Sequence, residues 1–256
     1  MAKEFNIDRK KQDAFAALSF RKAARAQKEG KFDSEIVPVK TKVLDKDDNP
    51  QEITVSKDEG IRADTTEESL SKLKPAFGEG GSTTAGNASQ VSDGAAAVLL
   101  MKRKTAHRLG LPILGKYITS AVIGCPARIM GVGPAYAIPA VCKKAGIQIR
   151  DIDIFELNEA FASQAVYTIE TLGLDIKKVN PVGGAIAMGH PLGCTGARQI
   201  ATLLPEMKRQ RAKIGCTTMC IGTGMGMAAL WENVRKPNNT LHPSRGKKKH
   251  YSLSLH

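Results

Sequence analysis

Between residues 113 and 233 the sequence alternates between short apolar runs and longer segments of helical periodicity, and this alternation constrains the fold most strongly. The apolar runs predict strands at 113–123, 151–158, 213–222 and 226–233, and residues 179–191 predict a glycine-rich strand and loop. The segments between them predict helices at 133–147, 159–174 and 192–210. This βαβαβαββ order predicts an α/β fold in which helices cover a sheet and loops at the strand ends carry the chemistry. Three helices are few for two sheet faces, so we expect half of a larger structure.

The first 110 residues predict a smaller segment that is rich in helix and loop. A helix is expected over 7–30, with Asp8 as its cap and Gly30 at its end. Residues 35–55 alternate like a β-hairpin that turns at 45–50, and residues 58–92 are rich in Gly, Ser and Thr. A second helix is expected over 93–110. The predicted division is therefore 1–110, 111–232 and a tail at 233–256.

Nearly half of the formal charge of +13 lies in that tail, which carries six positive charges and leaves +7 on the body. No acidic residue follows Glu232, whereas six basic residues do: Arg235, Lys236, Arg245, Lys247, Lys248 and Lys249. The composition predicts a disordered basic appendage. Only 5% of residues are aromatic, which argues against a stacking groove for nucleic acid, although binding of nucleic acid through the tail stays an alternative. The remaining positive charge suits a polyanionic small ligand.

Composition also bounds the class of protein. The chain has 256 residues, 42% of them hydrophobic, with a charged N-terminus and no run of about 18 apolar residues. We therefore expect a soluble intracellular protein with reduced cysteines. Cys216 and Cys220 are four residues apart and only His190 lies near them in sequence, so a zinc site is not expected.

Three junctions, at 158–162, 183–198 and 220–226, gather reactive groups at predicted strand ends, and the last two are rich in glycine. They carry Asn158, His190 and Cys220. His190 could be structural or solvated, and Cys220 could be a buried core residue. The sequence GTGMG lacks the spacing of a dinucleotide fingerprint and precedes a strand, which argues against a nicotinamide or flavin site.

At these junctions the sequence resembles the thiolase family, most closely the peroxisomal type of 3-ketoacyl-CoA thiolase. The resemblance covers residues 2–232. It rests on five blocks that occur in the family's order: TTAGNASQVSDGAAAVLLM, MGVGPAYAIP, ELNEAFASQA, NPVGGAIAMGHPLGCTGARQ and MCIGTGMG. It implies acyl transfer between 3-ketoacyl-CoA and CoA through a cysteine thioester, as in fatty acid β-oxidation.

The resemblance implies a role for each site residue. Cys220 matches the thiol that acts as acid and base, and His190 matches the histidine that activates the nucleophile and helps to hold the enolate oxygen. Asn158 matches the residue that orients a water in the same oxyanion hole, and the Gly222 N–H would bind the tetrahedral intermediate.

For binding, the resemblance places coenzyme A as a substrate at Arg62, Ser69, Ala85 and Ser89, with no permanent cofactor and no metal. Met130 and Phe161 match walls of the acyl pocket, although both could be ordinary core residues. The implied partners are acyl-CoA, CoA, and either a second copy or a full-length thiolase. No membrane span is expected.

One block of the family has no counterpart here, namely the small-residue loop that carries the nucleophilic cysteine. Cys194 could have a lowered pKa near a helix start, but the family carries a cysteine there without using it, and Cys125 and Cys142 have no base in view. We therefore expect a truncated isoform that is inactive alone. The alternative is a non-catalytic subunit that binds CoA esters or regulates a thiolase by pairing with it.

The expected localisation also depends on the family and on the absent half. The family predicts the peroxisome, and a cytoplasmic location follows if the absent half carries the targeting signal. The C-terminal Ser-Leu-His is a poor match to a peroxisomal address.

Overall fold

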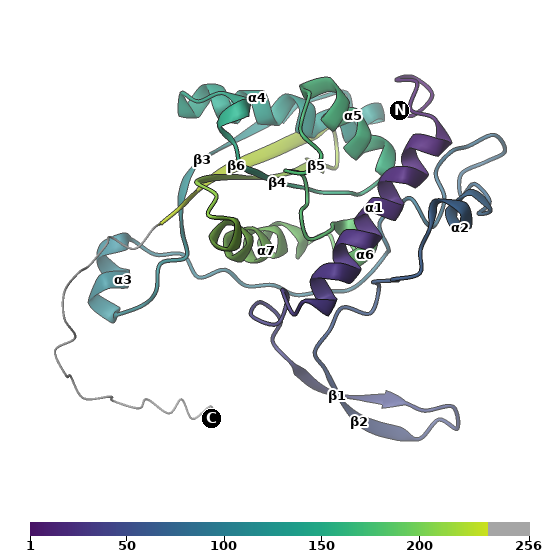
Figure 1. Cartoon of the computed structure of the whole chain (residues 1–256), viewed down its shortest axis with the longest axis horizontal. Helices are drawn as coiled ribbons and strands as arrows, with labels where there is room; N and C mark the ends of the chain where they lie inside the picture. Colours follow the sequence, from purple (N-terminus) through teal and green to yellow (C-terminus); the bar gives the residue numbers. More distant parts are fainter. Residues whose placement is uncertain (235–256) are drawn as a thin grey trace.

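A computed structural model describes residues 1–234, so the predicted basic tail lies outside the described residues from residue 235 onward. Its centre is a four-stranded sheet in the order β3-β6-β5-β4 (Figure 1). The strands are β3 (Gly115–Gly124), β4 (Ile154–Leu157), β5 (Ile214–Ile221) and β6 (Met225–Asn233). β4 and β5 are parallel, whereas β6 is antiparallel to both β5 and β3. β4 and β5 therefore end at the same edge.

Helices cover both faces of the sheet, as the sequence predicted. α4 (Gly133–Ala145) and α5 (Ala162–Leu172) lie on one face, and α7 (Thr195–Gln210) lies on the other (Figure 1). Side chains alternate along β4, because Phe155 packs into the core under α4 whereas Ile154 packs with Leu203 of α7. All four residues of β4 are buried, including Glu156, so helices cover this strand on both faces.

The N-terminal segment wraps around this layered body. Its long helix α1 (Arg9–Lys28) begins where the Asp8 carboxylate accepts a hydrogen bond from the Lys11 N–H at 2.7 Å. α1 packs against α5 and α6 (Ala185–Met188). The predicted hairpin consists of β1 (Val39–Leu44) and β2 (Pro50–Val55), and it projects from the body (Figure 1). The short helix α2 (Glu67–Ser71) and the 3₁₀ turns η1 (Ala127–Val132) and η2 (Ile149–Asp151) complete the connections.

Two sequence predictions are wrong. The helix expected over 93–110 is reduced to α3 (Arg103–Leu109), and residues 93–102 form no regular structure. A helix over 95–101 would be apolar on every face, and the described residues provide nothing to enclose it.

In the glycine-rich strand and loop expected over 179–191, the strand is reduced to one bridge between Val179 and Phe155, and α6 forms where a loop was expected. Asn180 and Gly183 adopt positive φ angles, which end the extended run. The Asn180 side chain bonds both the N–H and the C=O of Leu157 at 2.8 Å, so it replaces the backbone partners that a longer strand would supply. Among residues 1–234, no helix has the length and apolarity that crossing a bilayer would require.

Candidate active site

The candidate site lies at the edge where β4 and β5 end. Asn158 follows β4 directly, and its backbone N–H donates to the Thr218 carbonyl of β5 at 2.9 Å. Cys220 lies two residues further along β5. Because parallel strands present their carboxyl ends together, residues far apart in sequence meet here.

His190 is half-buried and is held through both ring nitrogens. Its Nδ1 lies 2.6 Å from the Thr195 hydroxyl, which itself donates to the Pro191 carbonyl at 3.0 Å. The hydroxyl must therefore accept from the ring, which assigns the proton to Nδ1. Nε2 is left as an acceptor for the Asn158 side-chain amide at 3.1 Å. Burial, with the Arg198 charge as a second cause, lowers the pKa of His190 and keeps the imidazole neutral at pH 7.

Cys220 is buried, and its Sγ lies 3.4 Å from Oε1 of Gln164, in the first turns of α5. Burial raises the pKa of the Cys220 thiol. The Gln164 side-chain amide donates to the backbone carbonyl of Asn158 at 3.2 Å. Hydrogen bonds therefore connect Cys220 to His190 through the Gln164 side chain and through Asn158, which contacts Gln164 with its backbone and His190 with its side chain. Sequence reasoning placed Cys220, His190 and Asn158 in one site, and the structure brings them together.

Sequence reasoning missed two members of this chain, Gln164 and Thr195. In the sequence, Gln164 is a polar residue within the predicted helix 159–174. Thr195 lies between Cys194 and Gly196 in the predicted helix 192–210, and neither position by itself indicates a role in the site. A usable signal for Thr195 was its hydroxyl five residues after His190, at the start of a helix.

Glu159 fixes the segments around the site. It is fully buried and accepts hydrogen bonds from the Ser19 hydroxyl at 2.6 Å, the Asn180 amide at 2.6 Å and the Ile186 N–H at 3.2 Å. Burial raises the pKa of this carboxyl group. The three bonds join α1, the segment after Val179 and α6 to the residue that follows Asn158.

Gly222 lies in the exposed turn between β5 and β6, and a Cβ there would meet nothing within 4 Å. Gly226, four residues on, is different, because a Cβ there would overlap the backbone carbonyl of Gly133. The close approach of Gly226 and Gly133 seats the hairpin that carries Cys220 against the start of α4.

The residues expected to bind coenzyme A divide into two groups. Ser89 lies beside the site, because its hydroxyl donates to the Ala160 carbonyl at 3.1 Å, and Ala85 is exposed in the same loop. Arg62 and Ser69 are exposed further along the N-terminal segment. The Ser69 hydroxyl bonds Thr66 within α2 and so belongs to a helix cap.

The two expected pocket residues are not fully buried. Phe161 is 36% exposed immediately before α5, and its backbone bridges to Ala88 of the loop that carries Ser89. Met130 is half-buried in η1, and its carbonyl lies 3.8 Å from the Cys125 thiol. Neither side chain is therefore a fully buried core residue.

The other four cysteines have raised pKa values. Burial raises the pKa of Cys142 to about 11 and also raises the pKa of Cys125 and Cys216. Cys194 is the N-cap residue of α7, a position that could lower its pKa. Burial instead raises the pKa of this thiol more than the nearby Arg198 charge lowers it.

The layered fold is that of the thiolases. The dimeric peroxisomal thiolase of Saccharomyces cerevisiae matches with a TM-score of 0.82 and 56% identity, over 91% of this chain and 57% of that chain. The acetyl-CoA acetyltransferase of Bacillus anthracis matches with a TM-score of 0.87 and 41% identity, over 91% of this chain and 58% of that chain.

Sequence comparison agrees. The profile described as thiolase, N-terminal domain, matches residues 1–104, and that described as thiolase, C-terminal domain, matches residues 111–233. A peroxisomal 3-ketoacyl-CoA thiolase of Yarrowia lipolytica is 61% identical over 230 residues, which are 90% of this chain and 56% of that protein. The human peroxisomal 3-ketoacyl-CoA thiolase is 61% identical over 233 residues, 91% of this chain and 55% of that protein. The chain belongs to the thiolase family, as the resemblance predicted, and spans a little over half the length of these relatives.

Proposed function

We propose that this chain carries the proton-transfer part of a 3-ketoacyl-CoA thiolase site, in which an acyl group passes between 3-ketoacyl-CoA and CoA. The observation that carries the proposal is the hydrogen-bonded chain from Cys220 through Gln164 and Asn158 to His190. The similarity to peroxisomal 3-ketoacyl-CoA thiolases supports the choice of reaction and a place in fatty acid β-oxidation.

In this proposal Cys220 moves the proton on the carbon next to the thioester. The neutral His190 uses Nε2 to accept a proton from an attacking thiol, and the resulting imidazolium donates to the enolate oxygen. Asn158 orients a water in the same oxyanion hole, and the Gly222 N–H in the open hairpin turn binds a tetrahedral oxyanion. Each role is consistent with the protonation state that the local contacts favour.

Coenzyme A serves as a substrate in this proposal, with Arg62, Ser69, Ala85 and Ser89 along its path and Met130 and Phe161 at the acyl group. The loop that carries Ala85 and Ser89 packs directly on the segment after Asn158, through the Ala88–Phe161 bridge. This contact supports entry of the thioester from that side.

We further propose that the chain does not turn over by itself. The reaction needs a second thiol as nucleophile. Burial raises the pKa of Cys125, Cys142, Cys194 and Cys216, and none of them is in the hydrogen-bonded chain with His190. These 256 residues thus supply a base and an acid without an activated nucleophile.

Alkylation and turnover assays test this function together. Acetoacetyl-CoA is expected to protect Cys220 from iodoacetamide in a saturable way, read by peptide mass spectrometry, whereas acetoacetate is not. Addition of CoA should give no thioester loss above buffer and no acylated cysteine by intact mass. Absence of protection would contradict the binding role. Thioester loss that disappears in Cys220→Ser would contradict the proposed inactivity.

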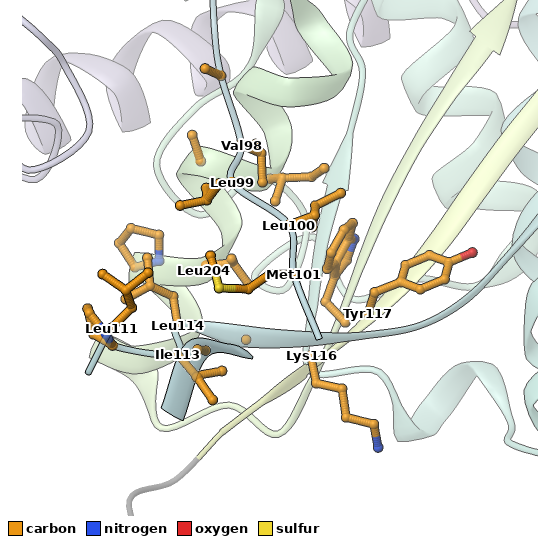
Figure 2. Close-up of a pocket in the computed structure, with 18 of the residues that line it drawn as sticks. Val98, Leu99, Leu100, Met101, Leu111, Ile113, Leu114, Lys116, Tyr117 and Leu204 are labelled. Carbon is orange, nitrogen blue, oxygen red and sulfur yellow. The ribbon is translucent and has the colours of Figure 1, made fainter. Parts of the chain in front are cut away.

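An apolar groove supports association with another thiolase chain, either a second copy or a full-length thiolase. A cavity of about 950 Å³ lies between the segment 97–103, the segment 111–117 and α7. Figure 2 shows the segment with Leu99, Leu100 and Met101 beside Leu204 of α7, and Leu111 and Leu114 lie next to Leu204. Leu99 is 78% exposed and Leu100 is 68% exposed, which is more apolar surface than an isolated chain usually leaves in water. The dimeric yeast relative also supports this partner.

Light scattering after size-exclusion chromatography tests this association. The chain is expected to elute as an oligomer, or as a complex when mixed with a full-length peroxisomal thiolase, and the double change Leu99→Glu with Leu100→Glu should reduce that mass to a monomer's. Lys46→Glu in the projecting hairpin turn is the matched control and should leave the mass unchanged. If the parent chain is monomeric and does not bind the full-length thiolase, the proposed association is refuted. The alternative function as a regulatory subunit is then refuted as well.

We propose a peroxisomal location, because the relatives are named peroxisomal thiolases. A cytoplasmic location is the alternative where no targeting signal accompanies these residues. Imaging of the tagged chain beside a peroxisomal marker distinguishes the two.

A further inference from the structure

Gln164 occupies an unusual position for a polar side chain. It is 1% exposed, on α5, and it lies between the Cys220 thiol and the backbone carbonyl of Asn158. The backbone carbonyl of Gln164 accepts from the Thr168 hydroxyl at 3.0 Å, which fixes the helix turn that carries the side chain. A buried amide that satisfies two partners is held in one orientation.

The partners decide which end of the amide faces which group. The Asn158 carbonyl can only accept a hydrogen bond, so it must face the NH₂ end of Gln164. Oε1 therefore faces Cys220, at 3.4 Å from Sγ. An amide oxygen accepts from a thiol S–H but has no proton to give to a thiolate.

We propose that Gln164 is a positioning residue that holds Cys220 as a protonated thiol and directs its S–H toward Oε1. The inference rests on the proposed role of Cys220 in proton transfer and adds the group that sets its resting state. The same side chain orients the backbone of Asn158, so one residue positions both the acid and the amide that contacts His190. The other titratable group that acts on Cys220 is the Cys125 thiol, in the turn after β3.

The test follows the rate of Cys220 alkylation by iodoacetamide against pH in the free chain, read on the Cys220 peptide. Gln164→Met removes this acceptor at similar volume. An amide oxygen stabilises only the protonated thiol, whereas an amide N–H in its place would lower the pKa of Cys220, so loss of the acceptor is expected to lower the midpoint pH of alkylation by about one unit, a tenfold change in thiolate population, and a rise would overturn the proposal. Gln164→Glu, as a protonated acid, can still donate to Asn158 and accept from the thiol, so its midpoint should equal or exceed that of the parent.

Cys216 lies on the same strand and is fully buried, so its slow alkylation reports an intact fold in every variant. Thr168→Val removes the neighbouring hydroxyl while leaving the Gln164 side chain in place, and its midpoint should match the parent. The proposal is overturned if Gln164→Met leaves the midpoint pH of Cys220 alkylation unchanged while Cys216 stays protected. It is also overturned if Gln164→Glu lowers this midpoint pH as much as Gln164→Met does.

A second measurement needs no variant at Gln164. The infrared S–H band of Cys220, identified by its loss in Cys220→Ser, should lie at the lower frequency of a hydrogen-bonded thiol. A free-thiol frequency would overturn the proposal. Neither measurement needs CoA, so failure here is separate from failure of the binding and turnover assays.

Discussion

Replacing Gly226 with alanine is expected to destabilise the chain by at least about 3 kcal/mol, enough to prevent folding of a marginally stable domain. The added Cβ would overlap the Gly133 carbonyl, and both partners are backbone atoms that no rotamer change can move apart. Gly226 pairs directly with Cys220 in β5, so any shift that relieves the overlap also displaces the candidate acid. Urea denaturation followed by fluorescence of Trp231, which is buried in β6, measures the loss.

Gly222→Ala is the matched control within the same hairpin. Nothing lies within 4 Å of a Cβ at this position, so the free energy of unfolding should change by less than about 1 kcal/mol. A Gly226→Ala chain as stable as the Gly222→Ala chain would show that β6 does not approach α4 as closely as the structure has it.

Replacing Glu159 with alanine is expected to cost roughly 3–5 kcal/mol of unfolding free energy. The change leaves a cavity and removes the acceptor of three buried donors, on Ser19, Asn180 and Ile186. Glu159→Gln keeps the volume and part of the acceptor capacity, so it should cost less. Urea denaturation of the two variants gives the comparison.

A surface carboxylate provides the control. Glu170 forms an ion pair with Lys11 at 2.7 Å between side chains that are about half exposed. Glu170→Ala should therefore change the unfolding free energy by less than about 1 kcal/mol. Equal effects at Glu159 and Glu170 would mean that the buried network does not hold α1 and α6 in place.

Much of the secondary structure was predictable because local signals and tertiary structure agree. Asp8 caps α1 as predicted, α4 begins at residue 133 as predicted, and β4 and most of β5 are buried. The strand predicted within 179–191 ends early because the Asn180 side chain, instead of strand backbone, bonds the N–H and C=O of Leu157. The prediction over 93–110 was wrong at residues 95–101, which are apolar throughout and form no helix.

The sequence by itself determined the family, the α/β order and the three reactive residues Asn158, His190 and Cys220, because these depend on residue types at fixed positions along the chain. Only the tertiary structure decided which groups control them. The Thr195 hydroxyl assigns the proton of His190, and Gln164 connects Cys220 to Asn158. Hydrogen bonds between side chains depend on distance and direction in space, and in this site they join residues up to 56 positions apart.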